Sequence, residues 1–263
     1  MKRYLTLILI FPLILILASC GKQIVNKKSD VLDRILKTGV IKVGTDFVGT
    51  PFAFYKDNNP TGFEVDLIEA MAAELSVKVE WVKTPFNVEN FEKILNNNEV
   101  DIIIESITRT MERKSKLDFS QPYFTSGQAV VLRKKEDVPD RFDLNFLKDK
   151  RVGVEKNTTG AIFAKNNTAA EIVEFENSQA LIDGLLNENV YAIISDIFST
   201  QTTGWPLWKE LKVVLKNLTH EEYCISIKKD EDEFLNRINS IIMNLKDDPI
   251  EGTYAKLYRK WFY

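Results

Sequence analysis

Short apolar runs alternate with amphipathic segments along the first half of the chain. The runs at residues 40–43, 77–82 and 102–104 predict strands, and the three isoleucines of residues 102–104 are typical of a strand buried on both faces of a sheet. Between them, residues 63–75 and 91–97 carry apolar side chains at the spacing of a helix. This succession predicts a doubly wound α/β sheet.

The second half of the chain follows the same plan. Apolar runs predict further strands at residues 128–132, 151–154, 172–175, 191–195 and 213–215. Helical spacing begins near residue 161 and returns over residues 180–186, so the unit is again β-α-β-α-β. The tail is expected to form two amphipathic helices, over residues 234–245 and 254–263.

Two extended segments are expected to join these units into a two-lobed α/β clamp. One lobe would contain residues 38–126 together with residues 222–263, and the other would contain residues 127–221. Lobes that share two extended crossings can close when a few backbone angles change. We predict that this hinge includes Ser126, Gly127, Gln128, Tyr223 and Cys224.

The N-terminus has the pattern of a secretory signal. Lys2 and Arg3 precede an unbroken apolar run from Tyr4 to Ala18, which is too short for a comfortable membrane span. The sequence Leu-Ala-Ser-Cys at residues 17–20 resembles the bacterial lipobox, which implies a signal peptide over residues 1–19 and acylation of Cys20. Residues 20–37 would then be a tether and the start of the body, held at the outer face of the cytoplasmic membrane or in the periplasm. The alternative is an uncleaved anchor helix.

Composition excludes several classes of function. The formal net charge is only −3, so no basic excess is available to hold nucleic acid. The two cysteines, Cys20 and Cys224, and the one histidine, His220, are too few for a disulfide framework or a Cys/His metal cluster. No Gly-rich phosphate loop or nucleophile elbow is present. We therefore expect a monomer without metal or cofactor, and a binding protein rather than an enzyme.

The segment from residue 101 to residue 127 carries the strongest candidate chemistry. Polar residues follow its buried strand, at the carboxyl end where the loops of an open α/β sheet bind ligands. Thr110 is a predicted N-cap, and Arg113 follows within one helical turn. An arginine there can grip a carboxylate in a bidentate way, although a lone arginine at this place is more often a surface charge.

The motif Thr110-x-x-Arg113, followed by Phe119-Ser120-Gln121-Pro122-Tyr123, resembles the signature of the bacterial extracellular solute-binding proteins, family 3. The closing segment of residues 252–262, GTYAKLYRKWF, resembles the end of the same family. The resemblance implies a periplasmic-binding-protein-like fold of type II. It also implies a receptor that closes on a polar amino acid and presents it to the permease of an ABC transporter.

Several binding residues follow from this resemblance. Ser106 and Thr108 match positions that bind the ligand, Arg113 matches the group that holds its carboxylate, and Asp196 matches the acid that holds its ammonium group. The loop of Asn157, Thr158 and Thr159 matches further carboxylate donors, with asparagine in place of the usual glycine; asparagine tolerates the left-handed region. Asp46 matches an acid that lines the side-chain pocket.

Three features bear on which ligand is bound. Gly49 stands where the family usually has an aromatic residue, and the position of the family's second aromatic wall is assigned to Val88, with Phe86 nearby. If Glu105 faces the crevice, the pocket is net negative and favours a cationic or neutral polar side chain. If Glu105 turns to solvent or pairs with Arg109, that inference fails.

Two other functions remain open from the sequence. One is an enzyme on the same fold, of the cyclohexadienyl or arogenate dehydratase type, with Glu105 as general acid. The other is a sensory domain that binds a solute without a role in transport.

Overall fold

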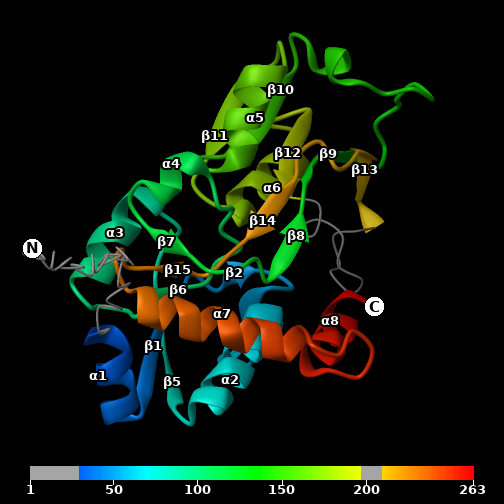
Figure 1. Ribbon diagram of the computed structural model, residues 1–263. Helices are drawn as coiled ribbons and strands as arrows, with labels where there is room; N and C mark the ends of the chain where they lie inside the picture. Colours follow the sequence, from blue (N-terminus) through cyan, green and yellow to red (C-terminus); the bar gives the residue numbers. More distant parts are fainter. Residues whose placement is uncertain (1–29, 197–208) are drawn as a thin grey trace, which may run out of the picture.

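The computed structural model describes residues 30–196 and 209–263, and Figure 1 shows them as two sheet-containing lobes, one above the other. Each lobe is built on a five-stranded mixed sheet. The predicted signal peptide and Cys20 lie outside the described residues. Within the described part of the chain, no helix is both long and apolar enough to cross a membrane.

The lower lobe in Figure 1 has the strand order β5-β1-β6-β15-β7. β1 is parallel to β5 and β6, and β15 is antiparallel to β6 and β7. These strands are Val40–Thr45 (β1), Lys78–Lys83 (β5), Ile102–Ile103 (β6), Asp118–Phe119 (β7) and Ser226–Ile227 (β15). The helices are Asp30–Thr38 (α1), Phe63–Leu75 (α2), Val88–Asn96 (α3), Met111–Lys114 (α4), Asp232–Lys246 (α7) and Thr253–Phe262 (α8).

Apolar side chains from α1, α2, α7 and α8 form one core with the sheet of this lobe. α3 contributes Phe91 and Leu95 to a second core with Ile103 and Cys224. The C-terminal helices therefore belong to the same lobe as the N-terminal strands, because their apolar faces are buried against one sheet.

The upper lobe has the strand order β11-β10-β12-β9-β13. β10 is parallel to β11 and β12, and β9 is antiparallel to β12 and β13. The elements are Gln128–Arg133 (β9), Arg151–Glu155 (β10), Glu171–Phe175 (β11), Ala192–Asp196 (β12), Leu211–Leu215 (β13), Thr159–Asn167 (α5), Ser178–Leu186 (α6) and a 3₁₀ turn at Leu144–Leu147.

A two-stranded ribbon connects the sheets. Phe124–Ser126 (β8) pairs antiparallel with Glu221–Tyr223 (β14), and β8 continues through Gly127 into β9. A side chain at Gly127 would meet the Thr219 carbonyl oxygen at 2.6 Å, so only glycine fits where the two crossings touch. The predicted hinge residues thus lie on or beside this ribbon.

A small antiparallel sheet follows β1 in the chain, and the sequence patterns did not predict it as a sheet. Its strands are Val48–Gly49 (β2), Ala53–Lys56 (β3) and Asn59–Thr61 (β4). Two-residue strands such as β2 show no readable periodicity. The fold places β2 beside the carboxyl end of β1, where Asp46 lies.

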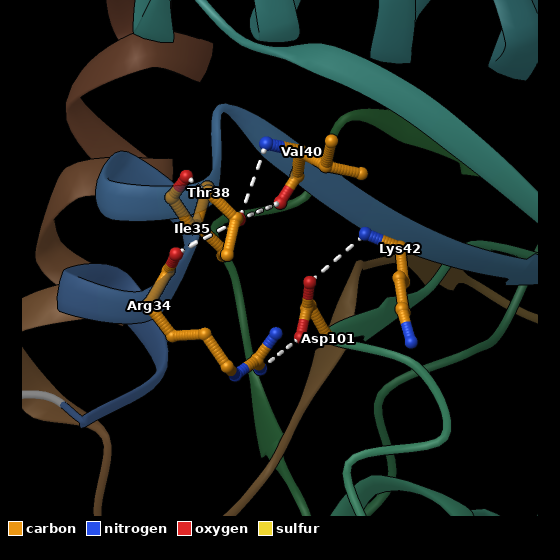
Figure 2. A network of polar contacts seen from close by, with 6 residues as sticks. All are labelled: Arg34, Ile35, Thr38, Val40, Lys42 and Asp101. Atoms are coloured by element: carbon orange, nitrogen blue, oxygen red, sulfur yellow. Dashed lines mark hydrogen bonds and ion pairs between the residues drawn. The ribbon is translucent and has the colours of Figure 1, made fainter.

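The far end of the lower sheet is held by a polar network around Asp101 (Figure 2). Arg34 of α1 forms an ion pair with Oδ1 of Asp101, and the Lys42 backbone N–H of β1 donates to Oδ2 at 2.8 Å. At the end of α1, the Thr38 hydroxyl donates to the Arg34 carbonyl oxygen at 2.9 Å. The buried Asp101 carboxylate therefore joins α1 to the first strand of the sheet.

Candidate functional site

A cavity of about 100 Å³ lies between the two lobes. From the lower lobe and its small sheet it is lined by Asp46, Val48, Gly49, Phe52, Ala53, Glu64, Phe86, Glu105, Ser106, Thr108 and Arg113. From the upper lobe and the connecting ribbon it is lined by Glu155, Thr158, Thr159, Ser178, Ser195, Asp196 and Tyr223. Most of the site residues predicted from the sequence therefore share one cavity, although they come from distant segments.

Arg113 is positioned by its helix and by two carbonyl groups. The hydroxyl of Thr110 accepts a hydrogen bond from the Arg113 backbone N–H at 3.1 Å, which caps α4 as predicted. The guanidinium donates to the Thr108 carbonyl at 2.9 Å and to the Asn157 carbonyl at 3.1 Å, so it reaches from one lobe to the other. Burial lowers the pKa of Arg113, while Glu221, Glu112 and Asp196 raise it. The guanidinium remains a cation, and its fork suits a carboxylate.

Asp196 supplies the opposite charge from the upper lobe. It is the last residue of β12 and lies opposite Gln128 of β9 in the antiparallel register. Burial raises the pKa of Asp196 to about 6, and hydrogen bonding by Tyr223 opposes the rise. An ammonium group that enters the cavity would stabilise the charged form of this acid.

Glu105 and Asp46 form a carboxyl pair on the lower wall. Glu105 is only 7% exposed, and among the described residues neither of its side-chain oxygens has a hydrogen-bonding partner of ordinary geometry. Burial, followed by the charges of Asp46 and Glu64, raises its pKa well above the ordinary value. Burial also raises the pKa of Asp46, although the Val48 N–H donates to that carboxylate at 3.0 Å. Glu105 thus faces the cavity rather than solvent, and Arg109 pairs with Glu222 instead.

The three residues of the loop 157–159 make different contacts. Asn157 adopts the left-handed conformation (φ 62°) that replaces the usual glycine, but its side chain does not line this cavity. Thr158 accepts a hydrogen bond from the Ala161 N–H at 3.1 Å and caps α5. Thr159 lines the cavity and donates to the buried Glu221 at 3.1 Å. Asn157 therefore contributes a carbonyl group that orients Arg113, not a side chain.

The aromatic wall comes from Phe86. Val88 lines a separate cavity between the lobes, so the interpretation of Val88 as part of the wall was wrong. Gly49 also lines the cavity, and a Cβ atom there would meet nothing within 4 Å, so no neighbouring atom fills the space where the usual aromatic side chain would begin.

Sequence reasoning missed two acids of the cavity. Glu155 ends β10, and burial together with the charges of Asp46 and Asp196 raises its pKa to about 8. Its place at the carboxyl end of a strand is the signal that had identified Asp46 and Asp196, and it could have been used here. Glu64 is the second residue of α2, and burial raises its pKa to about 7. An acid in a first helical turn is ordinary, so only the tertiary structure reveals Glu64.

The lining of the cavity is strongly acidic. Arg113 is its only basic side chain among the described residues, against the carboxyl groups of Asp46, Glu64, Glu105, Glu155 and Asp196. Within the same part of the chain, no group of three or more His, Cys, Asp or Glu side chains is arranged to hold a metal ion. The site suits an organic molecule that carries both a carboxylate and a positive charge.

Known proteins resemble this chain in sequence and in architecture. Residues 41–263 match the family described as bacterial extracellular solute-binding proteins, family 3. A probable histidine-binding protein of Neisseria gonorrhoeae is 29% identical over 255 residues, which cover 94% of this chain and 91% of that protein.

Two solved structures resemble the whole two-lobed body. The ancestral amino acid-binding protein AncCDT-1, a precursor of cyclohexadienyl dehydratase, is 36% identical with a TM-score of 0.78, over 88% of this chain and 99% of that one. An ancestral arginine-binding protein bound to arginine is 32% identical with a TM-score of 0.75, over 86% of this chain and 99% of that one. The fold is therefore the type II arrangement of these binding proteins, as predicted.

Proposed function

This chain belongs to the bacterial extracellular solute-binding proteins, family 3, and from that membership and its cavity we propose that it is a receptor for an amino acid. In this proposal the two lobes close on the ligand, and the closed form delivers it to the permease of an ABC transporter. The similarity to binding proteins for histidine and arginine supports an amino acid as ligand.

The observation that carries the proposal is the placement of opposite charges on opposite lobes. Arg113 and Asp196 line one cavity, and the negative charge of Asp196 raises the pKa of Arg113. A free amino acid loses water from both its charged groups when it is buried, so it needs an anion partner and a cation partner together. The carboxylate would bind at Arg113 and Thr159, and the α-ammonium group at Asp196.

We further propose that the preferred side chain is cationic. After Arg113 and Asp196 have bound the α-groups, the carboxyl groups of Asp46, Glu105 and Glu155 still line the cavity. An anionic side chain would meet like charge wherever these groups ionise, whereas an ammonium or guanidinium group would favour their charged form and pair with it. The open space beside Gly49 allows a long side chain.

The remaining parts of the proposal concern attachment and motion. Acylation of Cys20 after removal of residues 1–19 would anchor the protein at the cell envelope as a monomer. The lobes would be residues 38–126 with 222–263 and residues 127–221. Their hinge would lie at the β8–β14 ribbon, because its strands are the chain crossings between the two sheets.

A thermal-shift screen over the amino acids tests the receptor function. A true ligand should stabilise the protein by RT ln(1 + [L]/Kd), about 2.7 kcal/mol at a hundredfold excess over Kd. Arg113→Ala and Asp196→Ala should each abolish the shift while circular dichroism stays unchanged. Arg141→Ala, which removes an exposed arginine outside the cavity, is the matched control. Full affinity in both cavity variants would refute the proposal.

A dehydratase is the second candidate, because AncCDT-1 is described as the precursor of such an enzyme and Glu105 is a buried acid with a raised pKa. Such an acid could protonate a leaving group. We propose binding without turnover, and incubation with prephenate and arogenate should leave both compounds unchanged. Product formation that is lost in Glu105→Gln would establish the enzyme instead.

A further inference from the structure

Glu64 makes an unusual set of contacts for a cavity acid. It is 1% exposed, and its Oε1 atom accepts hydrogen bonds from the Ser106 backbone N–H at 2.8 Å and the Ser106 hydroxyl at 2.9 Å. The same oxygen accepts a hydrogen bond from the Tyr123 hydroxyl. Three donors from two distant segments therefore converge on one oxygen of α2, which is the arrangement expected for an ionised acceptor.

The loop that Glu64 holds is conformationally demanding. Ser106 has φ 51°, in the left-handed region that residues with a Cβ atom rarely adopt. Two hydrogen bonds from the same residue to Glu64 offset this strain. Without the carboxylate, the Ser106 N–H and hydroxyl would lose their described acceptor in a largely buried place.

The same loop continues directly to the residues proposed to bind the ligand. Two residues after Ser106, the Thr108 carbonyl accepts the hydrogen bond from the Arg113 guanidinium at 2.9 Å. Thr108 is also bridged to Tyr223 on the connecting ribbon. A change in the backbone at Ser106 would therefore move the carbonyl group that aims Arg113.

We propose that Glu64 is a positioning residue, whose carboxylate holds the loop of residues 105–108 in the shape that aims Arg113 at the ligand. This inference rests on the proposed receptor function. Tyr123 supports this arrangement without reaching the cavity. It is fully buried, does not line the cavity and donates a hydrogen bond to Glu64. Substitution of Tyr123 therefore tests the chain of contacts without touching the ligand.

The charged groups around Glu64 determine how its effect depends on pH. Its pKa of about 7 is raised by burial and by Asp46, and is lowered by the hydrogen bonds from Tyr123 and Ser106. Glu105 is close enough to feel its charge, and Arg113, Glu155 and Asp196 line the same cavity. Glu155 and Asp196 also have pKa values near neutral pH, about 8 and about 6. The contribution of Glu64 to the pH dependence of affinity is therefore the difference between the unaltered protein and Glu64→Gln.

The experiment measures L-arginine affinity by calorimetry from pH 5.5 to 8.5 in the unaltered protein, Glu64→Gln and Tyr123→Phe. We expect about tenfold weaker binding for Glu64→Gln and about threefold for Tyr123→Phe at pH 8. In the unaltered protein, part of the affinity should be lost as pH falls through about 7. In Tyr123→Phe this loss should begin at higher pH, because a hydrogen bond that lowers the pKa of Glu64 is gone. In Glu64→Gln this component should vanish.

Glu74→Gln makes the same chemical change at an exposed position of the same helix and is the matched control. Amide hydrogen exchange over residues 105–108 gives a readout that needs no ligand, and it should accelerate in both variants but not in the control. Unchanged exchange together with an unshifted pH profile in Tyr123→Phe would overturn the inference. If the unaltered protein binds no L-arginine, the proposed cationic ligand fails, and the exchange data alone decide whether Glu64 holds the loop.

Discussion

Strand β6 has a buried carboxyl group near each end, and the two groups differ in their contacts. Asp101 precedes the strand and is 2% exposed; one of its oxygens pairs with Arg34 and the other accepts from the Lys42 N–H (Figure 2). Glu105 follows the strand and is 7% exposed; neither of its oxygens has a hydrogen-bonding partner of ordinary geometry among the described residues. Both acids are therefore buried, but only Asp101 is paired with a cation.

The difference separates an acid that joins structural elements from an acid that faces the cavity. A buried carboxylate with a cation and a backbone donor joins the elements that surround it. A buried carboxyl group that lacks a cation partner destabilises the fold when it ionises, unless a bound cation compensates its charge. The same strand therefore anchors α1 at its beginning and forms the wall of the cavity at its end.

The largest effect is expected at the anchored end. Asp101→Ala should lower the free energy of unfolding by about 3 kcal/mol, because Arg34 loses its partner and the Lys42 N–H loses its acceptor. Urea denaturation measures this change. Amino-acid affinity should stay within about twofold, since Asp101 does not line the cavity. The exposed Asp140 provides the control Asp140→Ala. A large loss of affinity in a folded Asp101→Ala protein would contradict the purely structural role of Asp101.

The cavity end should respond in the opposite way. Glu105→Gln should change the free energy of unfolding by no more than about 1 kcal/mol, because no ion pair is lost. Its affinity for L-arginine should fall at least tenfold, roughly 1.4 kcal/mol, since one carboxyl group can no longer ionise beside the bound cation. Calorimetry measures the affinity and urea denaturation the stability. Destabilisation comparable to that of Asp101→Ala would contradict the distinction.

The smallest effect concerns how the affinity for L-arginine depends on pH. Ionisation of Glu155 should change this affinity by up to about tenfold. Its pKa of about 8 is raised above the ordinary 4.5, so the unliganded protein loses stability as pH rises toward 8. The affinity for a cation changes in the opposite sense, because more of Glu155 is ionised as pH rises through 8. Affinity for L-arginine should therefore increase between pH 7 and 9, and Glu155→Gln should remove that increase. An unchanged profile in this variant would show that Glu155 does not face the bound cation.

Local patterns were sufficient for much of the fold. Helix α2 was predicted over residues 63–75, where the structure has it, because its apolar residues recur at helical spacing. Helix α6 was predicted to within a few residues for the same reason, and strand β10 was predicted from its short apolar run. In the small sheet formed by β2, β3 and β4, residues 51–62 suggest only one strand and a turn, since strands of two to four residues are too short to show a period.

The candidate site was predictable only in part. The rule that ligands bind at the carboxyl ends of strands identified Asp46, Glu105 and Asp196, which do line one cavity. Glu64 was not predicted, because its partner Ser106 lies 42 residues further along the chain. Asn157 was expected in the ligand-binding loop in place of a glycine, and in the structure its carbonyl group accepts a hydrogen bond from Arg113. Nothing in the local sequence reports which atom of a loop residue faces inward.

The sequence by itself determined the order of helices and strands, the family motif at Thr110 and Arg113, and the presence of acids at strand ends. These features depend on neighbours within one or two turns of chain, so a periodic or short-range pattern records them. Only the tertiary structure decided which acids are paired and which are left facing the cavity. That distinction depends on contacts such as Asp101 with Arg34, 67 residues apart, which exist only after the sheet has assembled.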